Sequence, residues 1–387
     1  MKIALITDGI YPYVMGGMQK HSYFLAKYLA KNKIKIDLYH YIAITKKDLP
    51  SPFSEEELEY IGLIEIDYPK PKKFPGHYLY ERYEYSKRVL EVFLSRSMPD
   101  FVYAKGFAAW AMLKFKKKHD INVPIGVNFH GYEMFQKWPN FKTGMHLQIL
   151  KPPVLYHIRK ADKLFSYGGK ISDIIKSKGQ SSKIIEIPTG IGSNWLREPK
   201  ELVVNDTIKF VFVGRSERRK GIEEINTVLY KIKDKFNFEF HFVGPIDESK
   251  QIQDSKITYH GPIYDADKLK DILDSMDVLV CPSYSEGMPN VIMEGMARGC
   301  AIIATDVGAV SEMVSETNGW LITGAIADEV KLAMNEALQM STQALRMKKE
   351  ESIKKVASYF TWEQVIKQTE NKIVEITRNS ESINNCL

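Results

Sequence analysis

Short apolar runs alternate with amphipathic segments along almost the whole chain. The apolar runs have the length of buried strands, and the segments between them carry apolar residues at helical spacing. In the first half this pattern predicts strands at 2–8, 34–40, 62–67, 100–104, 124–130, 163–167 and 183–188, and helices at 18–31, 79–97, 107–118, 148–161 and 170–178. Such alternation is typical of parallel sheets whose strands are connected by helices.

A second series of the same kind begins at Ile208. Its predicted strands are 208–213, 238–243, 257–260, 277–282, 301–305 and 319–323, with a helix at 221–236 and further helices between the later strands. The polar stretch 193–207 separates the two series. The prediction is an α/β protein with two Rossmann-like domains, residues 1–192 and 208–359, joined by this linker. Open α/β sheets bind ligands at the carboxyl ends of their strands, so functional residues should gather in a cleft between facing domains.

Length and composition agree with two domains in a soluble protein. A chain of 387 residues exceeds what one hydrophobic core usually supports. It contains no run of 18 apolar residues, and its start reaches an acidic residue and glycines too soon for a signal peptide. Three cysteines are too few for a disulfide framework. We therefore expect a cytoplasmic protein.

The formal net charge of +6 admits an anionic partner without choosing one. Nucleic acid is disfavoured because no zinc-finger spacing, basic zipper or aromatic RNA-binding signature occurs in the sequence. A nucleotide-sugar is one remaining candidate. An anionic membrane surface, contacted peripherally at the inner face of the cell membrane, is the other.

Three clusters of candidate residues directly follow predicted strands. Gly16-Gly17 precedes the helix at 18–31, where paired glycines let a phosphate approach backbone amides at the positive helix end; a plain turn is the alternative. His130 ends the strand 124–130 and could donate or accept a proton there, or merely bond a neighbouring loop. The turn Gly214–Gly221 carries Arg215 and Lys220, which could grip a diphosphate or form ordinary surface charge.

The fourth cluster is the stretch from Ser285 to Gly299. Glu286 lies in the loop after the strand 277–282, and Glu294 lies in the helix that follows. Pro289 suits the first turn of that helix, whose opening amides at 288–291 could hold a diphosphate. A carboxylate among apolar neighbours needs partners, and ribose hydroxyls would serve Glu294. The alternative is a pair of solvated glutamates.

Other nucleotide-binding motifs are missing from the sequence. It contains neither a full G-x-G-x-x-G fingerprint nor a Walker A loop, which disfavours a dehydrogenase or an NTPase. The segment Asp265-Ala266-Asp267 matches the metal-binding D-x-D pattern of another fold, but it precedes a predicted helix at 267–275. Helix capping is therefore the better interpretation of Asp265.

The four clusters together resemble glycosyltransferase family 4, the large group of retaining enzymes with the two-domain GT-B fold. The glycine pair, the histidine, the turn G-R-x-x-x-x-K-G and the E-x(7)-E stretch occur in the order and spacing of that family, over nearly the whole chain. One departure is Pro188-Thr189-Gly190-Ile191-Gly192, which lacks the aspartate that the family often has in P-x-G-V-D. The resemblance implies that residues 360–387 form a helix crossing back to the first domain.

The resemblance also implies roles for individual residues. Gly17, with Gly16 beside it, would contact the donor phosphate through its backbone. His130 would face the donor sugar near the reacting carbon. Arg215 and Lys220 would neutralise the diphosphate.

The remaining implied roles belong to the fourth cluster. Glu286 would bind hydroxyls of the donor hexose, and Glu294 would hold the ribose hydroxyls. The donor-site residues between them would be Gly287, Met288, Pro289, Asn290 and Val291. His130, Arg215, Lys220 and Glu286 form the expected catalytic set.

These assignments predict a metal-independent hexosyltransferase with no cofactor, in which fixed positive groups and helix N-termini stabilise the departing nucleoside diphosphate. A UDP-sugar is favoured as donor over GDP-mannose, on family frequency. The likeness of 286–308 to bacterial capsule and lipopolysaccharide enzymes suggests a glycan or lipid-linked acceptor. A sugar-nucleotide epimerase of the same fold is the nearest alternative, and a non-catalytic nucleotide-binding or membrane-associated scaffold is the alternative from another class.

Overall fold

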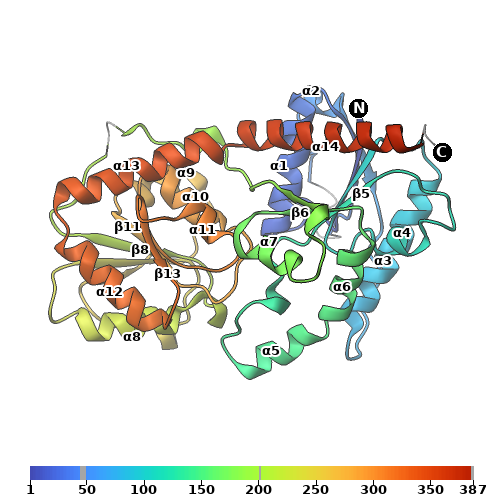
Figure 1. The fold of residues 1–387 in the computed structure, drawn as a ribbon. Helices are drawn as coiled ribbons and strands as arrows, with labels where there is room; N and C mark the ends of the chain where they lie inside the picture. Colours follow the sequence, from blue (N-terminus) through green and yellow to red (C-terminus); the bar gives the residue numbers. More distant parts are fainter. Residues whose placement is uncertain (44–48, 200–201, 385–387) are drawn as a thin grey trace.

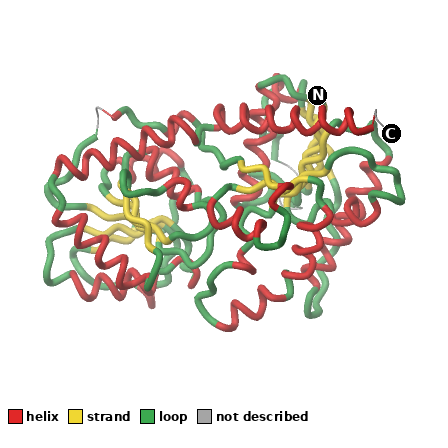
Figure 2. Tube along the Cα trace, viewed as in Figure 1, coloured by secondary structure: helices red, strands yellow, loops and turns green. Residues whose placement is uncertain are grey.

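The computed structural model describes residues 1–43, 49–199 and 202–384. These residues form two separate parallel sheets, one of seven and one of six strands, each surrounded by helices (Figures 1 and 2). The predicted GT-B arrangement of two Rossmann-like units is confirmed. Residues 200 and 201 of the predicted linker, and Cys386, lie outside the described residues.

The first sheet has the strand order β3-β2-β1-β4-β5-β6-β7. Its strands are β1 (Lys2–Ile6), β2 (Lys35–His40), β3 (Ile61–Glu65), β4 (Phe101–Lys105), β5 (Ile125–Asn128), β6 (Lys163–Ser166) and β7 (Ile184–Glu186). Successive side chains of β1 enter different cores: Ile3 and Leu5 face one, Ala4 and Ile6 the other. A strand buried on both faces reads as a continuous apolar run, as β1, β4 and β5 largely do, whereas β3 and β7 have exposed positions and were located by their shorter apolar runs.

Helices cover both faces of the first sheet. They are α1 (Gly17–Lys31), α2 (Glu55–Leu58), α3 (His77–Leu94), α4 (Trp110–Phe115), α5 (Phe141–Gln148), α6 (Lys151–Lys160) and α7 (Gly169–Lys176). Two of them, α2 and α5, were not predicted. The helix α2 has only four residues and three of these are acidic, whereas α5 buries only Gly144. The helix α2 is therefore too short to show the apolar stripe by which a helix is recognised in a sequence, and the large apolar residues Phe141 and Met145 of α5 face solvent rather than a core.

The second sheet has the order β10-β9-β8-β11-β12-β13. Its strands are β8 (Lys209–Val213), β9 (Glu239–Val243), β10 (Ile257–Tyr259), β11 (Val278–Cys281), β12 (Ala301–Thr305) and β13 (Gly319–Ile322). The helices of this half are α8 (Ile222–Ile232), α9 (Ala266–Asp274), α10 (Asn290–Ala297), α11 (Val310–Met313), α12 (Ile326–Gln339) and α13 (Thr342–Tyr359). Strand order reverses direction at β8 and β11, the kind of switch point where such sheets bind ligands.

The last helix, α14 (Trp362–Asn384), begins beside the second sheet and runs along the first (Figure 1). It contacts α1, and its Trp362, Ile366 and Ile373 are buried in the same core as strand β1. Thr361, directly before the helix, pairs with Ile191 in an isolated parallel bridge. The C-terminal helix thus contributes to the core of the first half although its sequence follows the second.

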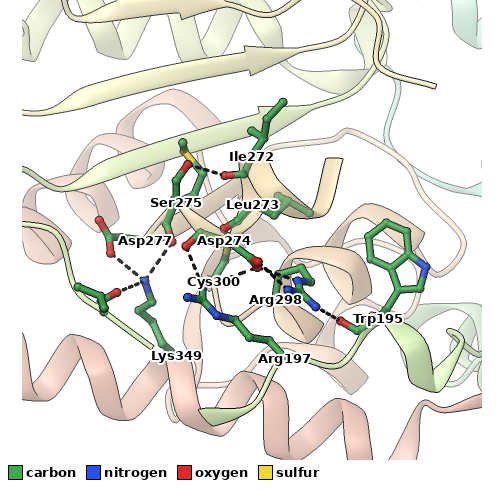
Figure 3. A network of polar contacts seen from close by, with 12 residues as sticks. Trp195, Arg197, Ile272, Leu273, Asp274, Ser275, Asp277, Arg298, Cys300 and Lys349 are labelled. Atoms are coloured by element: carbon green, nitrogen blue, oxygen red, sulfur yellow. Dashed lines mark hydrogen bonds and ion pairs between the residues drawn. The ribbon is translucent and has the colours of Figure 1, made fainter. Parts of the chain in front are cut away.

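A buried polar network attaches the segment after the first sheet to the second half (Figure 3). Lys349 of α13 has its ammonium 2.8 Å from Asp277 Oδ1, and both side chains are almost completely buried. The same ammonium donates to the Val203 carbonyl at 2.9 Å, while Asp277 accepts from the Asn205 amide group at 2.8 Å. Nearby, Arg298 bonds both oxygens of Asp274. Part of the predicted linker is therefore held against the second sheet.

Candidate active site

A cavity of about 500 Å³ lies between the two halves. One wall comes from the start of α1 and the segments after β5, β6 and β7, and the other comes from the segments after β8, β9, β10 and β11 with the start of α10. The lining residues are Gly17, Met18, His21, His130, Tyr167, Thr189, Val213, Gly214, Arg215, Arg219, Lys220, Val243, Gly244, Pro245, Pro262, Ile263, Tyr264, Leu269, Glu286, Gly287, Met288, Pro289, Asn290 and Val291. The cleft between facing strand ends is therefore where it was predicted.

On the first side, the cavity meets the start of α1 and the end of β5. A side chain at Gly17 would meet no atom within 4 Å, so a ligand has free access to the backbone there. Gly16, the residue before the helix, does not itself line the cavity. His130 lies just beyond β5 in a left-handed conformation with φ 61°, and its Nδ1 is 2.5 Å from the Tyr167 hydroxyl. Its buried Nε2 has no hydrogen-bond partner among the described residues.

A buried lysine lies behind this histidine. Lys105, at the end of β4, has its Nζ 3.0 Å from His21 Nδ1, and the His21 ring packs edge-on against the His130 ring. No carboxylate of the described chain pairs with Lys105, and burial lowers its pKa well below the usual range. Burial, and then the neighbouring Lys105 charge, lower the pKa of His130 and of His21 well below 6.5. Both imidazoles at the cavity wall are therefore neutral at pH 7.

On the second side, the turn after β8 places three basic residues at the cavity. Lys220 Nζ is 2.5 Å from Glu286 Oε1, and Arg219 Nη1 is 3.5 Å from the same oxygen. Arg215 also lines the cavity, but its side chain is 71% exposed and pairs with Glu217 at 2.8 Å. Lys220 and Glu286, both predicted site residues, are therefore in direct contact at the cavity wall, while Arg215 lies nearer the opening.

The segment 286–291 forms the rest of this wall and leads into α10. Pro289 is the residue before the helix rather than its first residue, so the helix opens with Asn290. The backbone N–H groups of Met288, Asn290 and Val291 lie at that N-terminus, where the helix dipole favours an anion, whereas Pro289 has no N–H to donate. A side chain at Gly287 would meet the His130 carbonyl oxygen at 2.9 Å, so only glycine lets the two walls approach this closely.

Glu294 lies one turn further along α10 and does not line the cavity itself. Burial raises the pKa of this carboxyl, and the charge of Lys20 from α1 partly offsets that effect. Lys20 and Glu294 belong to helices of different halves. The Glu294 carboxylate is therefore near enough to Lys20 for the two charges to interact across the cleft.

Hydrogen bonds cross the cleft beside the cavity. The Gln136 side chain donates to the Glu286 carbonyl at 2.6 Å and accepts from the Glu286 amide at 3.3 Å. The Gly169 amide donates to Glu312 Oε1 at 2.9 Å, and the Thr189 amide approaches Met288 Sδ at 3.4 Å. The two halves are therefore in direct contact on the cavity's rim.

The structure adds four residues that the motifs did not single out: Arg219, His21, Tyr167 and Lys105. Arg219 lies within the recognised turn, and His21 lies one helical turn after Gly17, so spacing could have pointed to both. Tyr167 and Lys105 come from other strands and carry no local signal. The D-x-D segment acts as predicted, because the Asp265 side chain accepts from the amides of Asp267 and Lys268 and so caps α9.

Two parallel-sheet units facing each other across a cavity are the GT-B architecture. One family model, Glycosyltransferase Family 4, matches residues 15–194, and a second, Glycosyl transferases group 1, matches residues 207–340. The chain belongs to the family 4, or group 1, glycosyltransferases.

One similar protein covers nearly all of the chain, and another covers just under half of it. It is 26% identical to an uncharacterized glycosyltransferase of Methanocaldococcus jannaschii over 95% of this chain and 96% of that protein. It is 27% identical to the capsular polysaccharide biosynthesis glycosyltransferase CapM of Staphylococcus aureus, over 45% of this chain and 49% of CapM.

Two solved structures share the fold. Sucrose-phosphate synthase of Thermosynechococcus elongatus has a TM-score of 0.74 at 18% identity, covering 98% of this chain and 99% of that one. HepE of Anabaena, in complex with UDP-glucose, has a TM-score of 0.67 at 16% identity, covering 97% and 100%.

Proposed function

We propose that this glycosyltransferase moves a hexosyl unit from a nucleotide-diphosphate sugar to an acceptor hydroxyl with retention of anomeric configuration. One observation carries the proposal: Lys220, Arg219 and the opening amides of α10 converge on one cavity, opposite the start of α1 and His130. These are the fixed positive groups that a departing nucleoside diphosphate requires. Arg215, nearer the opening, would neutralise charge on the diphosphate as it enters.

The donor would lie along the second wall. Glu294 would hold the ribose hydroxyls, and Glu286, positioned by Lys220, would hold hydroxyls of the hexose. The apolar residues Pro245, Ile263 and Leu269 line the same cavity and would accept the flat face of the base. A UDP-sugar is favoured over GDP-mannose, and the UDP-glucose complex of HepE, a protein of the same fold, supports that choice.

The reaction follows from these positions. The bond between the anomeric carbon and the phosphate oxygen breaks, and the electron pair goes to that oxygen. The acceptor oxygen bonds the same carbon on the same face, and its proton passes to the departing phosphate. Neutral His130 would stay close to the sugar as a hydrogen-bonding group, because burial keeps it from charging at pH 7. Fixed cations take the role that a metal has in other transferases, so no cofactor is proposed.

The acceptor is proposed to be a glycan or a lipid-linked sugar in bacterial surface polysaccharide synthesis. The match to CapM, whose name places it in capsular polysaccharide biosynthesis, supports this setting. Among the described residues, none of the helices combines the length and apolar character needed to cross a bilayer. A cytoplasmic location with peripheral contact at the inner face of the membrane is the corresponding proposal.

The first test is a screen of nucleotide-sugars by thermal shift, followed by acceptor-dependent release of nucleotide. Release of the free nucleotide with formation of a glycosylated product supports transfer. A changed sugar still attached to nucleotide would favour the epimerase instead. Donor binding without any turnover would favour a non-catalytic scaffold.

The second test concerns the ribose contact. Glu294→Ala should weaken donor binding by about 10- to 100-fold, because hydrogen bonds to a charged group contribute roughly 1.5–3 kcal/mol. Asp328→Ala, on the exposed side of α12, is the matched control and should bind normally. Unchanged donor affinity in a folded Glu294→Ala protein would remove the ribose assignment.

A further inference from the structure

Helix α5 projects from the first half and exposes a stripe of large apolar side chains. Phe141, Met145 and Ile149 follow one another at intervals of four residues, so they lie on one side of the helix. Their exposed fractions are 77%, 59% and 53%, and Trp138 just before the helix is 38% exposed. Isolated exposed apolar residues are ordinary, but a contiguous set of this size marks an interaction site.

The charged residues that flank this stripe along the chain are all positive. No aspartate or glutamate occurs between 134 and 161, a range that contains Lys137, Lys142, Lys151, Arg159 and Lys160. Lys137 and Lys142 are exposed next to the stripe. Apolar side chains flanked by lysines suit the boundary of an anionic bilayer, where rings and aliphatic chains enter the headgroup region and ammonium groups meet lipid phosphates.

The helix is held rigidly although its outer side is uncovered. The Asn140 side chain caps it by accepting from the Thr143 amide at 2.9 Å. Trp138 packs so closely on Gly144 that an added side-chain carbon would lie 2.2 Å from the indole. Leu147 and Leu150 face inward against the first core. The outward stripe is therefore presented in a fixed orientation, without cover from the part of the chain that the structure describes.

A second segment has the same character. The loop before α3 carries Lys70, Lys72, Lys73 and Phe74, and no acidic residue occurs between 68 and 80. All four side chains are exposed. In Figure 1, α5 and this loop both project from the lower side of the first half, opposite α14. Two acid-free basic segments with exposed aromatic rings on one side favour a planar anionic partner.

We propose that the stripe Phe141, Met145 and Ile149, with its flanking lysines, is a docking surface for an anionic lipid bilayer. This docking surface is inferred from the exposure and charge of its own residues and does not depend on the proposed transfer reaction. It is nevertheless linked to the cavity, because the 3₁₀ helix Glu133–Phe135 contacts α5 and leads directly to Gln136, which bonds Glu286.

The test uses sedimentation of the full chain with vesicles, without donor or acceptor. Wild-type protein should bind vesicles containing phosphatidylglycerol and should dissociate as salt rises, since each nearby lysine favours the anionic surface by about fivefold. Phe141→Ser combined with Ile149→Ser should lose at least about tenfold in partitioning. Leu332→Ser combined with Met347→Ser removes two similarly exposed apolar residues from the second half and should bind normally. Thermal midpoints of all variants check that they are folded.

Three results would overturn the proposal. The first is no binding of wild-type protein to phosphatidylglycerol vesicles at low salt. The second is equal loss in the two double variants, which would show unspecific adsorption. The third is a wild-type dimer that the α5 variant converts to a monomer in sedimentation velocity, which would assign the stripe to a second copy of this chain. None of these readouts involves turnover, so failure here is distinct from failure of the proposed reaction.

Discussion

Replacing Lys349 with methionine should strongly destabilise the second half of the molecule. The Lys349 ammonium makes three short contacts, to the carbonyls of Val203 and Met276 and to Asp277 Oδ1, and its side chain is 1% exposed. Methionine keeps most of the volume but removes the charge. Asp277, which is fully buried, would then hold a carboxylate without a cation.

The size of the loss in stability depends on the hydrogen bonds that Asp277 retains when Lys349 is replaced. Breaking a fully buried pair by removing one partner costs about 3–5 kcal/mol. Asp277 still accepts from the Asn205 side chain at 2.8 Å and from the Lys209 amide at 3.0 Å, so the lower end applies. We expect a loss of about 3 kcal/mol, which corresponds to a thermal midpoint lower by about 6–12 °C for a domain of this size.

Thermal and urea unfolding, followed by circular dichroism, measure this change. Lys354→Met, on the same helix but 75% exposed and paired with Glu351 at 3.4 Å, is the control and should stay within about 0.5 kcal/mol. Adding Asp277→Asn to Lys349→Met should recover part of the loss, because the buried charge is then gone. A loss below about 1 kcal/mol for Lys349→Met, or a double variant less stable by the sum of both single losses, would refute the reasoning.

Four further predictions concern the cavity and the response to pH. Lys220→Ala should lower kcat on the order of a hundredfold, because this group acts on leaving-group charge, while the control Lys233→Ala should leave kcat unchanged. Near-normal turnover of Lys220→Ala would place the diphosphate elsewhere. Activity should survive EDTA, and a complete loss that magnesium or manganese restores would contradict the metal-free proposal. Saturating donor should reduce the radius of gyration in small-angle scattering. Gln136→Ala should enlarge the difference between the donor-free and donor-bound values, because it weakens the contact across the cleft. Identical profiles with and without donor would argue against closure by donor. Burial lowers the pKa of His157 to about 4, so the unfolded chain, with a pKa near 6.5, binds more protons as pH falls below 6.5. Between pH 7 and pH 5 wild-type protein should therefore lose about 2 kcal/mol more than His157→Phe, and equal losses would exclude this histidine as the cause.

The sequence by itself determined the strands, the division into two α/β units and the segment 286–291 with Arg215 and Lys220 on one wall of the cavity. Buried parallel strands are continuous apolar runs, and their positions depend on local composition alone. Lys220 and Glu286 were predicted because each lies in a turn directly after such a run. The capping role of Asp265 could be predicted for the same reason, since a cap depends only on the helix that follows it.

The tertiary structure alone decided what comes together from distant segments. His21 and Tyr167 line the cavity, with Lys105 behind them, because β4 and β6 end and α1 begins at the same edge of the sheet, and no spacing along the chain encodes that meeting. Gln136 reaches Glu286 only when the two halves are placed against each other. The outward stripe of α5 is a further case, because an apolar residue in the sequence predicts burial, and only the packing of Leu147 and Leu150 beneath the helix leaves Phe141 facing solvent.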